Sequence, residues 1–307
     1  MRKFLYILCF GLLLTTCDDG DIFEVTLDFE DTFEQCGNSS LVFYKINEST
    51  SETLSIQLTT LTLEDILEVD DDNLYENTLS LASSNAFNYR SYGRIPTSNF
   101  FCNDIPPSDL QIEKDEVSIS GEVYIKTILV EDDNDGIPTE LEDENLDGDN
   151  DPDTNPTDTD GDGIYDYLDA DDDGDNVLTT SEGVNYTEED GLINALDTDG
   201  DGIPNYLDKD DDGDGVDTRD EENINVNQNP TDDVTDPDFG EADYLNDQVF
   251  TTVVATTYRT HTIRMIYTVT ALVSEISLPS ITQQTLDFGV LVDPGTLDSR
   301  IGTPIFN

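Results

Sequence analysis

Two patterns of hydrophobic and polar positions alternate along this chain of 307 residues. In the first, apolar side chains occupy every second position of short runs, as in Phe23 to Phe29, Leu41 to Ile46 and Leu54 to Leu58. A similar run extends from Val117 to Leu129, and the stretch from Val249 to Val273 is dense in Thr, Val, Ile and Tyr. Because successive side chains of a strand point to opposite faces, these segments predict half-buried β-strands. The chain is therefore expected to be mainly β.

These β-rich segments fall in two flanks, residues 17–130 and 245–307. Together they comprise about 177 residues, enough for the core of one sandwich. We expect one β-sandwich-like domain in which the strand ending at Val130 pairs with a strand near residues 259–270. The middle of the chain would then be an irregular array inserted in their connection. Two separate small β domains, joined by that middle segment, are the alternative.

The second pattern occupies residues 131–244, where carboxylates replace the apolar side chains. About 43 of the 71 acidic residues lie there, against two basic ones, Lys209 and Arg219, and the formal net charge of the chain is −59. Such a charge opposes binding to nucleic acid. A block of like charge with few apolar residues is also typical of a disordered linker.

The acidic residues recur at fixed spacings, which a disordered linker does not require. The string DTDGDGIYDYLDADDDGDNV at residues 158–177 returns 39 residues later, at 197–216, as DTDGDGIPNYLDKDDDGDGV, with four differences. Ca²⁺ takes six to eight oxygen ligands, and a twelve-residue loop supplies them from places 1, 3, 5, 7, 9 and 12, with glycine at place 6. Four loops fit this spacing, a fifth is looser and a sixth is incomplete.

The residues predicted to bind several Ca²⁺ ions are Glu131, Asp133, Asp135, Glu142, Asp147, Asp149, Asp158, Asp160, Asp162, Ile164 (through its carbonyl), Asp166, Asp169, Asp171, Asp173, Asp175, Glu182, Asp197, Asp199, Asp201, Ile203 (through its carbonyl), Asn205, Asp208, Asp210, Asp212, Asp214 and Glu221.

EF-hands are the nearest competing interpretation of these loops. An EF-hand flanks each loop with amphipathic helices, whereas the segments between these loops are too short for helices and Pro204 interrupts one of them. The apolar residues Ile164 and Ile203 also stand at place 7, one place earlier than in an EF-hand. Both features disfavour EF-hands without excluding them.

The loops resemble the calcium-binding type 3 repeats of thrombospondins, as these occur in many bacterial surface proteins. The motif D-x-D-x-D-G-x-x-[DN]-x-x-D is satisfied at Asp158 to Asp169 and at Asp197 to Asp208, and the next loop begins 13 residues after each start. The resemblance covers about a third of the chain and implies a calcium-wrapped string with little regular secondary structure. The cysteines of the animal repeats are missing here, so the array must rely more on bound ions.

The amino terminus predicts export and a lipid anchor. Residues 1–16 carry Arg2 and Lys3 before an apolar run of about eleven residues, which suits a signal peptide and is too short to span a bilayer. The run ends at Cys17 in a sequence that resembles a bacterial lipobox, so Cys17 is predicted to be lipidated and to attach the protein to a membrane. Acidic residues follow directly, as in surface lipoproteins of the Bacteroidetes. We expect the outer membrane, at the cell surface; an ordinary signal peptide with an incidental cysteine is the alternative.

Two cysteines remain once Cys9 and Cys17 are set aside. In an exported protein, Cys36 and Cys102 are expected to form a disulfide, with a reactive thiol as the alternative. The aromatic cluster of Tyr89, Tyr92, Phe100 and Phe101 is predicted to lie in a core rather than on a sugar-binding face.

Catalysis finds little support in the sequence. The single histidine, His261, lies in a β-rich run and is predicted as a strand-surface residue, and no G-x-S-x-G or glycine-rich phosphate loop occurs. We therefore predict a non-enzymatic, calcium-binding, lipid-anchored cell-surface protein with a structural, adhesion or ligand-presenting role and a possible protein or glycan ligand. The alternative is a surface lipoprotein enzyme or a glycan-binding module that uses the repeats as a calcium-stiffened spacer.

Overall fold

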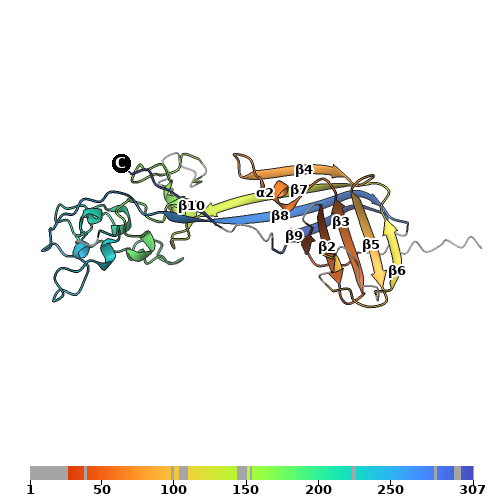
Figure 1. Cartoon of the computed structure of the whole chain (residues 1–307), viewed down its shortest axis with the longest axis horizontal. Helices are drawn as coiled ribbons and strands as arrows, with labels where there is room; N and C mark the ends of the chain where they lie inside the picture. The colour runs from red at the N-terminus through yellow and green to blue at the C-terminus, as the bar shows by residue number, and fades with distance from the viewer. Residues whose placement is uncertain are drawn as a thin grey trace, which may run out of the picture. The chain divides into compact units, whose positions relative to one another are not determined.

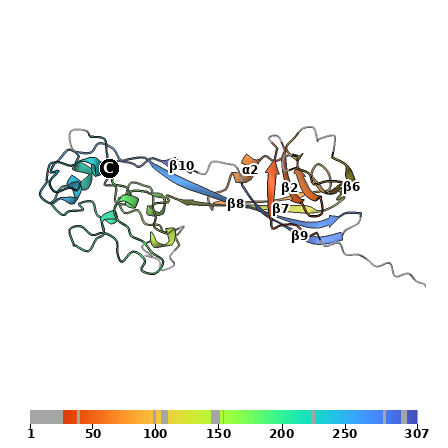
Figure 2. The same ribbon diagram turned by 90° about the horizontal axis from the view of Figure 1, so that it is seen from below.

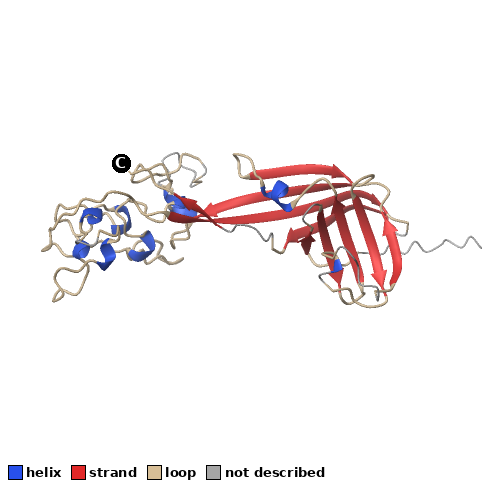
Figure 3. Cartoon of the chain, in the orientation of Figure 1, coloured by secondary structure: helices blue, strands red, loops and turns tan. Residues whose placement is uncertain are grey.

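The computed structural model describes residues 27–37, 40–97, 100–103, 110–143, 151–152, 154–222, 226–279, 282–293 and 299–306. The predicted signal peptide, the predicted lipidation site Cys17 and the predicted ligands Asp147 and Asp149 lie outside these residues. The fold is mainly β, as the sequence predicted, and its helices are short (Figure 3). No helix in the described part of the chain is long and apolar enough to cross a membrane.

The chain divides into two compact units. The β unit comprises residues 1–68, 76–126 and 269–293, and the repeat unit comprises residues 69–75, 127–268 and 294–307. The strands are β1 (Thr32–Cys36), β2 (Leu41–Asn47), β3 (Glu52–Leu58), β4 (Leu74–Ser80), β5 (Ala86–Tyr92), β6 (Ile112–Val117), β7 (Glu122–Asp132), β8 (His261–Ser277), β9 (Thr282–Leu291) and β10 (Ser299–Gly302). The single α-helix among the described residues, α2 (Leu63–Leu67), begins with a capping box between Thr62 and Asp65.

All ten strands belong to one sheet, in the order β4-β7-β8-β9-β1-β2-β3-β5-β6, with β10 paired to β8. The pairing of β1 with β9 is parallel, whereas β1–β2, β2–β3, β3–β5, β5–β6 and β8–β9 are antiparallel. β7 enters the acidic array and β8 follows it, and these two strands lie side by side (Figures 1 and 2). The array is thus inserted between two neighbouring strands.

The sheet of the β unit curls around an aromatic core. Phe87 on β5 and Phe288 on β9 lie on strands that are not neighbours in the sheet, yet their ring centroids are 6.4 Å apart. Phe33 on β1 contacts both Phe288 and Phe43, at 5.4 and 4.7 Å. One curled sheet therefore forms the sandwich-like enclosure, with β5 and β9 facing each other across the core. Rings at these distances add about 0.5–1.5 kcal/mol per pair beyond the burial of their area.

The predicted disulfide is present, since Cys36 is bonded to Cys102. In the chain-entropy model, closing a loop of this length stabilises the fold by roughly 4 kcal/mol. Tyr89, Tyr92 and Phe100 are buried as predicted, and Phe101 stacks on Tyr44 at 4.5 Å.

One predicted strand is shorter than expected. The run from Val249 to Val273 forms a strand only from His261 onward, where β8 begins. Residues 253–260, here named the strap, hydrogen-bond mainly to loops of the array rather than to a neighbouring strand. Alternation in the sequence did not reveal this, because an extended segment bound by loops has the same residue preferences as a strand.

Outside its strand segments, the repeat unit consists of loops joined by single turns of 3-10 helix (Figure 3), and it has a small apolar cluster of its own. Ile137, Val184 and Tyr206 are buried in that cluster. The turns are η2 (Thr139–Leu141), η3 (Asp166–Leu168), η4 (Thr179–Ser181), η5 (Asn205–Leu207), η6 (Thr218–Asp220), η7 (Pro230–Asp232) and η8 (Asp243–Leu245).

Candidate metal centres

Two groups of four carboxylates lie inside the repeat unit. In each group the four candidate ligand oxygens lie within 4.8 Å of one another. All eight side chains are buried, and within the described part of the chain none of them forms an ion pair. Cluster 1 consists of Asp133, Asp135, Glu142 and Asp172, and cluster 2 of Asp173, Asp175, Glu182 and Asp211.

The local backbone aims these carboxylates inward. Oδ1 of Asp133 accepts the N–H of Asp135 at 2.9 Å, and Oδ1 of Asp135 accepts the N–H of Ile137 at 2.7 Å. Asp175 accepts the N–H of Val177 in the same way, at 2.6 Å. In each case Oδ2 is buried without a hydrogen bond. An aspartate that accepts a backbone N–H two residues on fixes its own rotamer, so one oxygen holds the turn and the other is left for a ligand.

Burial and mutual repulsion make these clusters unstable as bare anions. Burial, followed by the neighbouring Asp135, raises the pKa of Asp133 to about 9, and burial with Asp133 raises that of Glu142 to about 10. The same causes hold the pKa values of Asp172, Asp173, Asp175 and Glu182 well above their ordinary range. Buried carboxylates need protons or cations to compensate them. The oxygen-only donors and the unpaired inward oxygens fit a hard divalent cation.

Each cluster is shared between two loops that are not consecutive in the sequence. Three members of cluster 1 come from the loop that begins at Glu131, and the fourth, Asp172, is the second residue of the loop that begins at Asp171. Cluster 2 repeats this arrangement, with Asp211 as the second residue of the loop that begins at Asp210. Asp172 and Asp211 were not predicted as ligands, because place 2 of an isolated loop points away from its own ion. Their separation of 39 residues, the repeat length, was the available signal.

Three further groups bring predicted ligands together. In each group, the aspartates at places 1, 3 and 5 of one loop lie close together. The groups are Asp158, Asp160 and Asp162; Asp197, Asp199 and Asp201; and Asp210, Asp212 and Asp214. Place 6 of the first two loops is Gly163 and Gly202, with φ of +97° and +101°, a conformation that glycine adopts without strain. Burial and then Asp212 raise the pKa of Glu221, the predicted last ligand of the third loop, to about 9.

The place 9 residues hydrogen-bond to the place 2 threonine of their own loop. Asp166 accepts the N–H and the hydroxyl of Thr159 at 2.8 and 2.7 Å, and Asn205 accepts the N–H of Thr198 at 2.9 Å. Burial, followed by the charge of Asp166, raises the pKa of Asp172 in cluster 1. The place 7 residues Ile164 and Ile203 donate their N–H groups to the place 5 aspartates.

The first predicted ligand, Glu131, has another partner. Its carboxylate forms a two-pronged ion pair with Arg300, at 2.6 Å from Nε and 3.0 Å from Nη2. The bidentate geometry uses both oxygens of Glu131. Cluster 1 forms without Glu131, and its partner Arg300, 169 residues away in the sequence, was not foreseen.

A third, degenerate copy of the repeat follows the two obvious ones. Asp243 is buried and accepts the N–H and the hydroxyl of Thr235 at 2.6 and 2.7 Å, just as Asp166 does with Thr159. Its charge contributes to the raised pKa of Glu221. Asp243 was missed because the loop before it has lost the aspartate spacing. The recurring Tyr-Leu pair after residues 166, 205 and 243 was the signal.

His261 also differs from its prediction. It was expected on a strand surface, but it is 3% exposed and its Nε2 lies 3.3 Å from Oδ1 of Asp169. Sequence alternation correctly placed it in a strand, and only the fold shows that a loop of the array covers it.

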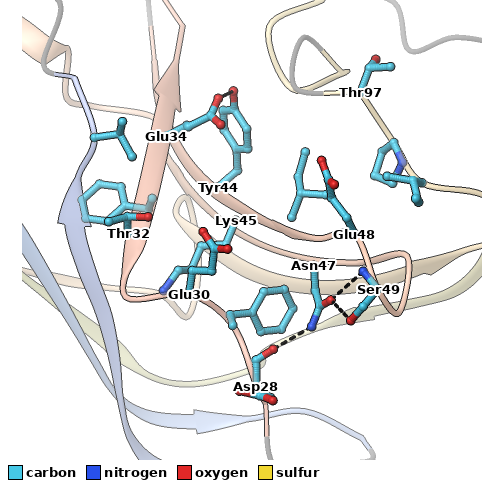
Figure 4. Close-up of a pocket in the computed structure, with 16 residues that line it drawn as sticks. Asp28, Glu30, Thr32, Glu34, Tyr44, Lys45, Asn47, Glu48, Ser49 and Thr97 are labelled. Carbon is cyan, nitrogen blue, oxygen red and sulfur yellow. Dashed lines mark hydrogen bonds between the residues drawn. The ribbon is translucent and has the colours of Figure 1, made fainter.

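A separate hollow of about 900 Å³ opens in the β unit (Figure 4). Lys45 lies in it, buried, with Nζ 5.2 Å from the ring centroid of Phe288. Burial lowers the pKa of Lys45, while the charges of Asp31 and Asp287 oppose that shift. Other lining residues are Asp28, Glu30, Tyr44, Asn47, Ile95 and Val292. The volume suits a small ligand.

Comparison with known proteins gives one match. A family model described as BamM C-terminal matches residues 132–197. This match covers 66 of the 307 residues and includes every member of cluster 1. No curated protein and no solved structure matches the chain.

Proposed function

We propose that this protein is a calcium-binding surface protein whose repeat array becomes rigid when it is loaded with Ca²⁺. The observation that carries this proposal is the pair of four-carboxylate clusters, each buried, with oxygens turned inward and with no basic partner among the residues that the structure describes. A chain that buries several ionised groups of one sign stays folded only when a counter-charge compensates them. A bound divalent cation supplies that charge.

Calcium fits these clusters better than a transition metal. Every member of clusters 1 and 2 is an aspartate or a glutamate, and neither imidazole nor thiolate takes part. Oxygen-only sites of this kind are preferred by hard cations, whereas zinc and copper favour nitrogen and sulfur. Calcium also tolerates the irregular geometry of loops better than Mg²⁺, which requires a near-ideal octahedron.

Calorimetric titration of the full chain with Ca²⁺ tests the proposal. Extracellular modules bind calcium with Kd of about 10⁻⁴ to 10⁻³ M, so several ions per chain should bind in that range. Small-angle scattering before and after addition of a chelator should show expansion of the chain, because the metal-free array repels itself. A dialysed protein that takes up no calcium at millimolar concentration overturns the proposal.

We further propose that Cys17 anchors the protein in an outer membrane, at the cell surface. The lipobox-like sequence before Cys17 and the BamM C-terminal match support this setting. A Cys17→Ser variant should leave the membrane fraction, and mass spectrometry of the mature protein should find acyl groups on Cys17. A mature amino terminus without lipid would contradict the anchor while leaving the calcium sites unaffected.

The role that best accommodates both units is structural or ligand-presenting, with the array as a calcium-dependent support. The hollow lined by Tyr44, Lys45 and Ile95 favours a second function, binding of a small ligand or glycan by the β unit. Glycan arrays probed with wild-type protein and with Lys45→Met and Ile95→Asp variants test this function. Equal binding by all three proteins would exclude the hollow as the site.

A further inference from the structure

The loops 158–169 and 197–208 have the same sequence pattern and share several internal hydrogen bonds. Asp160 accepts the N–H of Asp162 at 2.9 Å, and Asp199 accepts that of Asp201 at 2.9 Å. At the end of each loop, Oδ1 of the place 12 aspartate accepts the N–H two residues on, at 3.0 Å for Asp169 and 3.1 Å for Asp208. Locally, the two loops are equivalent.

They differ in what covers them. Asp169 is 2% exposed and contacts His261, whereas Asp208 is half-buried. Because His261 is the only histidine of the chain, no second imidazole can serve Asp208. Ile305 lies next to Gly163, and Gly302 lies next to Ile164, so the carboxyl-terminal segment also covers the first loop.

From this difference we infer that His261 is a positioning residue for the cation of loop 158–169, and that this loop releases its ion more slowly than loop 197–208. The inference rests on the proposed calcium function. Oδ1 of Asp169 accepts the N–H of Asp171, and Nε2 of His261 lies 3.3 Å from the same oxygen. With Oδ1 fixed, Oδ2 is available to the ion in a single orientation.

The imidazole presents Nε2 to Asp169 in this arrangement. Nδ1 of His261 is buried and has no hydrogen-bond partner in the described part of the chain, so the proton resides on Nε2, the nitrogen that faces Oδ1 of Asp169. Partners that orient a metal ligand typically change metal affinity 10–100-fold when they are removed.

The strap holds His261 in place. The N–H of Arg259 donates to Oδ1 of Asn176 at 3.0 Å, and Nδ2 of Asn176 donates to the carbonyl of Thr257 at 3.3 Å. On the other side, His261 pairs with Gly302 of β10. A side chain held from both directions gives a fixed donor rather than a mobile one.

Stopped-flow release of Ca²⁺ from the full chain into a fluorescent chelator tests the inference. Wild-type protein should show a slow phase that Asp162→Asn removes and that the matched variant Asp201→Asn leaves in place. His261→Leu should accelerate this phase about tenfold, and His261→Gln, whose amide also donates, should restore most of the wild-type rate. Circular dichroism should show an unchanged β content in both His261 variants.

Two results would overturn the inference. If His261→Leu releases calcium as slowly as wild type, or if Asp201→Asn removes the slow phase, His261 does not position the ion of loop 158–169. Normal calcium stoichiometry in those experiments would leave the proposed function intact. A wild-type chain that binds no calcium would instead overturn both the proposed function and this inference.

Discussion

The twin segments 158–177 and 197–216 share sixteen of twenty residues, yet they occupy different environments. Asp162 is 2% exposed in the first segment, whereas its counterpart Asp201 is exposed in the second. The first segment is covered by the strap and by residues 299–306, which follow the array in the chain. The comparison shows that the local sequence determines the shape of a loop and that remote segments determine its burial.

Burial changes the energetics of the two twins. It raises the pKa of Asp160 to about 6 and, together with Asp171, that of Asp169 to about 9. The pKa of Asp208 is also raised by burial, but this residue keeps contact with water. Desolvated carboxylates resist ionisation unless a cation is near. The folded structure of the covered segment, 158–177, should therefore depend more strongly on bound metal than that of the open segment, 197–216.

The largest expected effect is the pH dependence of the metal-free protein. A carboxyl whose pKa is raised binds its proton more tightly in the folded chain, so metal-free stability falls as the pH rises above about 4, the ordinary value. The loss should continue through the folded pKa values, from about 6 for Asp160 to about 10 for Glu142. Metal-free protein should therefore melt at a higher temperature at pH 5 than at pH 8.

Saturating calcium should reverse this dependence, because protons then compete with the ion for the same oxygens. Scanning calorimetry at both pH values, with calcium and with chelator, measures the four melting temperatures. A metal-free protein that is more stable at pH 8 would show that the carboxylates have partners other than protons or cations.

A second effect distinguishes clusters 1 and 2. Asp172→Asn and Asp211→Asn each keep an oxygen but remove one charge from a four-carboxylate group, so each should weaken one calcium site at least tenfold. Asp211→Asn should be the more severe, because Asp166 adds a charge beside cluster 1 while the corresponding residue beside cluster 2 is the neutral Asn205.

Calcium titration calorimetry of both variants measures this difference, with Glu188→Gln, an exposed residue of the same unit, as the control. Equal affinities in Asp172→Asn and Asp211→Asn would mean that Asp166 does not contribute to cluster 1.

How much of this organisation the sequence revealed depends on the distance between the interacting residues. Alternation of apolar and polar residues predicted a mainly β chain. The predicted export of the protein, together with the two cysteines left outside the leader, predicted the Cys36–Cys102 disulfide. The aspartate phase predicted which carboxylates lie together within a loop, as in Asp158 to Asp162, because spacing along a tight turn is a local property.

Interactions between loops were beyond such reasoning. The closure of cluster 1 by Asp172 depends on how one repeat stacks on the next, and the pairing of Glu131 with Arg300 depends on where β10 lies. The strap was predicted as part of a strand because its backbone is bound by loop carbonyls and side chains, as in the bond from Ala255 to Asp220 at 2.8 Å. These contacts follow from tertiary packing, which one sequence does not specify locally.

Substitution of two matched glycines should have a moderate effect. A Cβ at Gly174 would lie 2.2 Å from Oδ2 of Asp160, and one at Gly213 would lie 2.5 Å from Oδ2 of Asp199. Both glycines have φ near +70°, so Gly174→Ala and Gly213→Ala should each cost about 1–3 kcal/mol. Gly174→Ala should cost more, because the exposed Asp199 can move aside while the half-buried Asp160 cannot.

Urea unfolding in saturating calcium measures both free energies. Equal losses in the two glycine variants would show that the covering of the first twin does not restrict Asp160.

The smallest effect concerns place 6 of the second loop in each twin, where Asn176 and Gly215 correspond. Both adopt positive φ, of 72° and 95°, which glycine accommodates more easily than asparagine. Asn176 nevertheless stabilises the first twin, because its side chain bonds to the strap at Thr257 and Arg259. Asn176→Gly should relieve the backbone but leave the N–H of Arg259 without its acceptor, for a net loss of about 1 kcal/mol.

The reciprocal change, Gly215→Asn, should lose only a few tenths of a kcal/mol, since Gly215 is exposed and asparagine tolerates this conformation. Thermal unfolding in calcium compares the two variants directly. If Asn176→Gly proved as mild as Gly215→Asn, the strap would be held by its remaining contacts, such as the N–H of Val253 to the carbonyl of Asp220 at 2.7 Å. The difference between the twins would then originate at Asp169 and His261 rather than at Asn176.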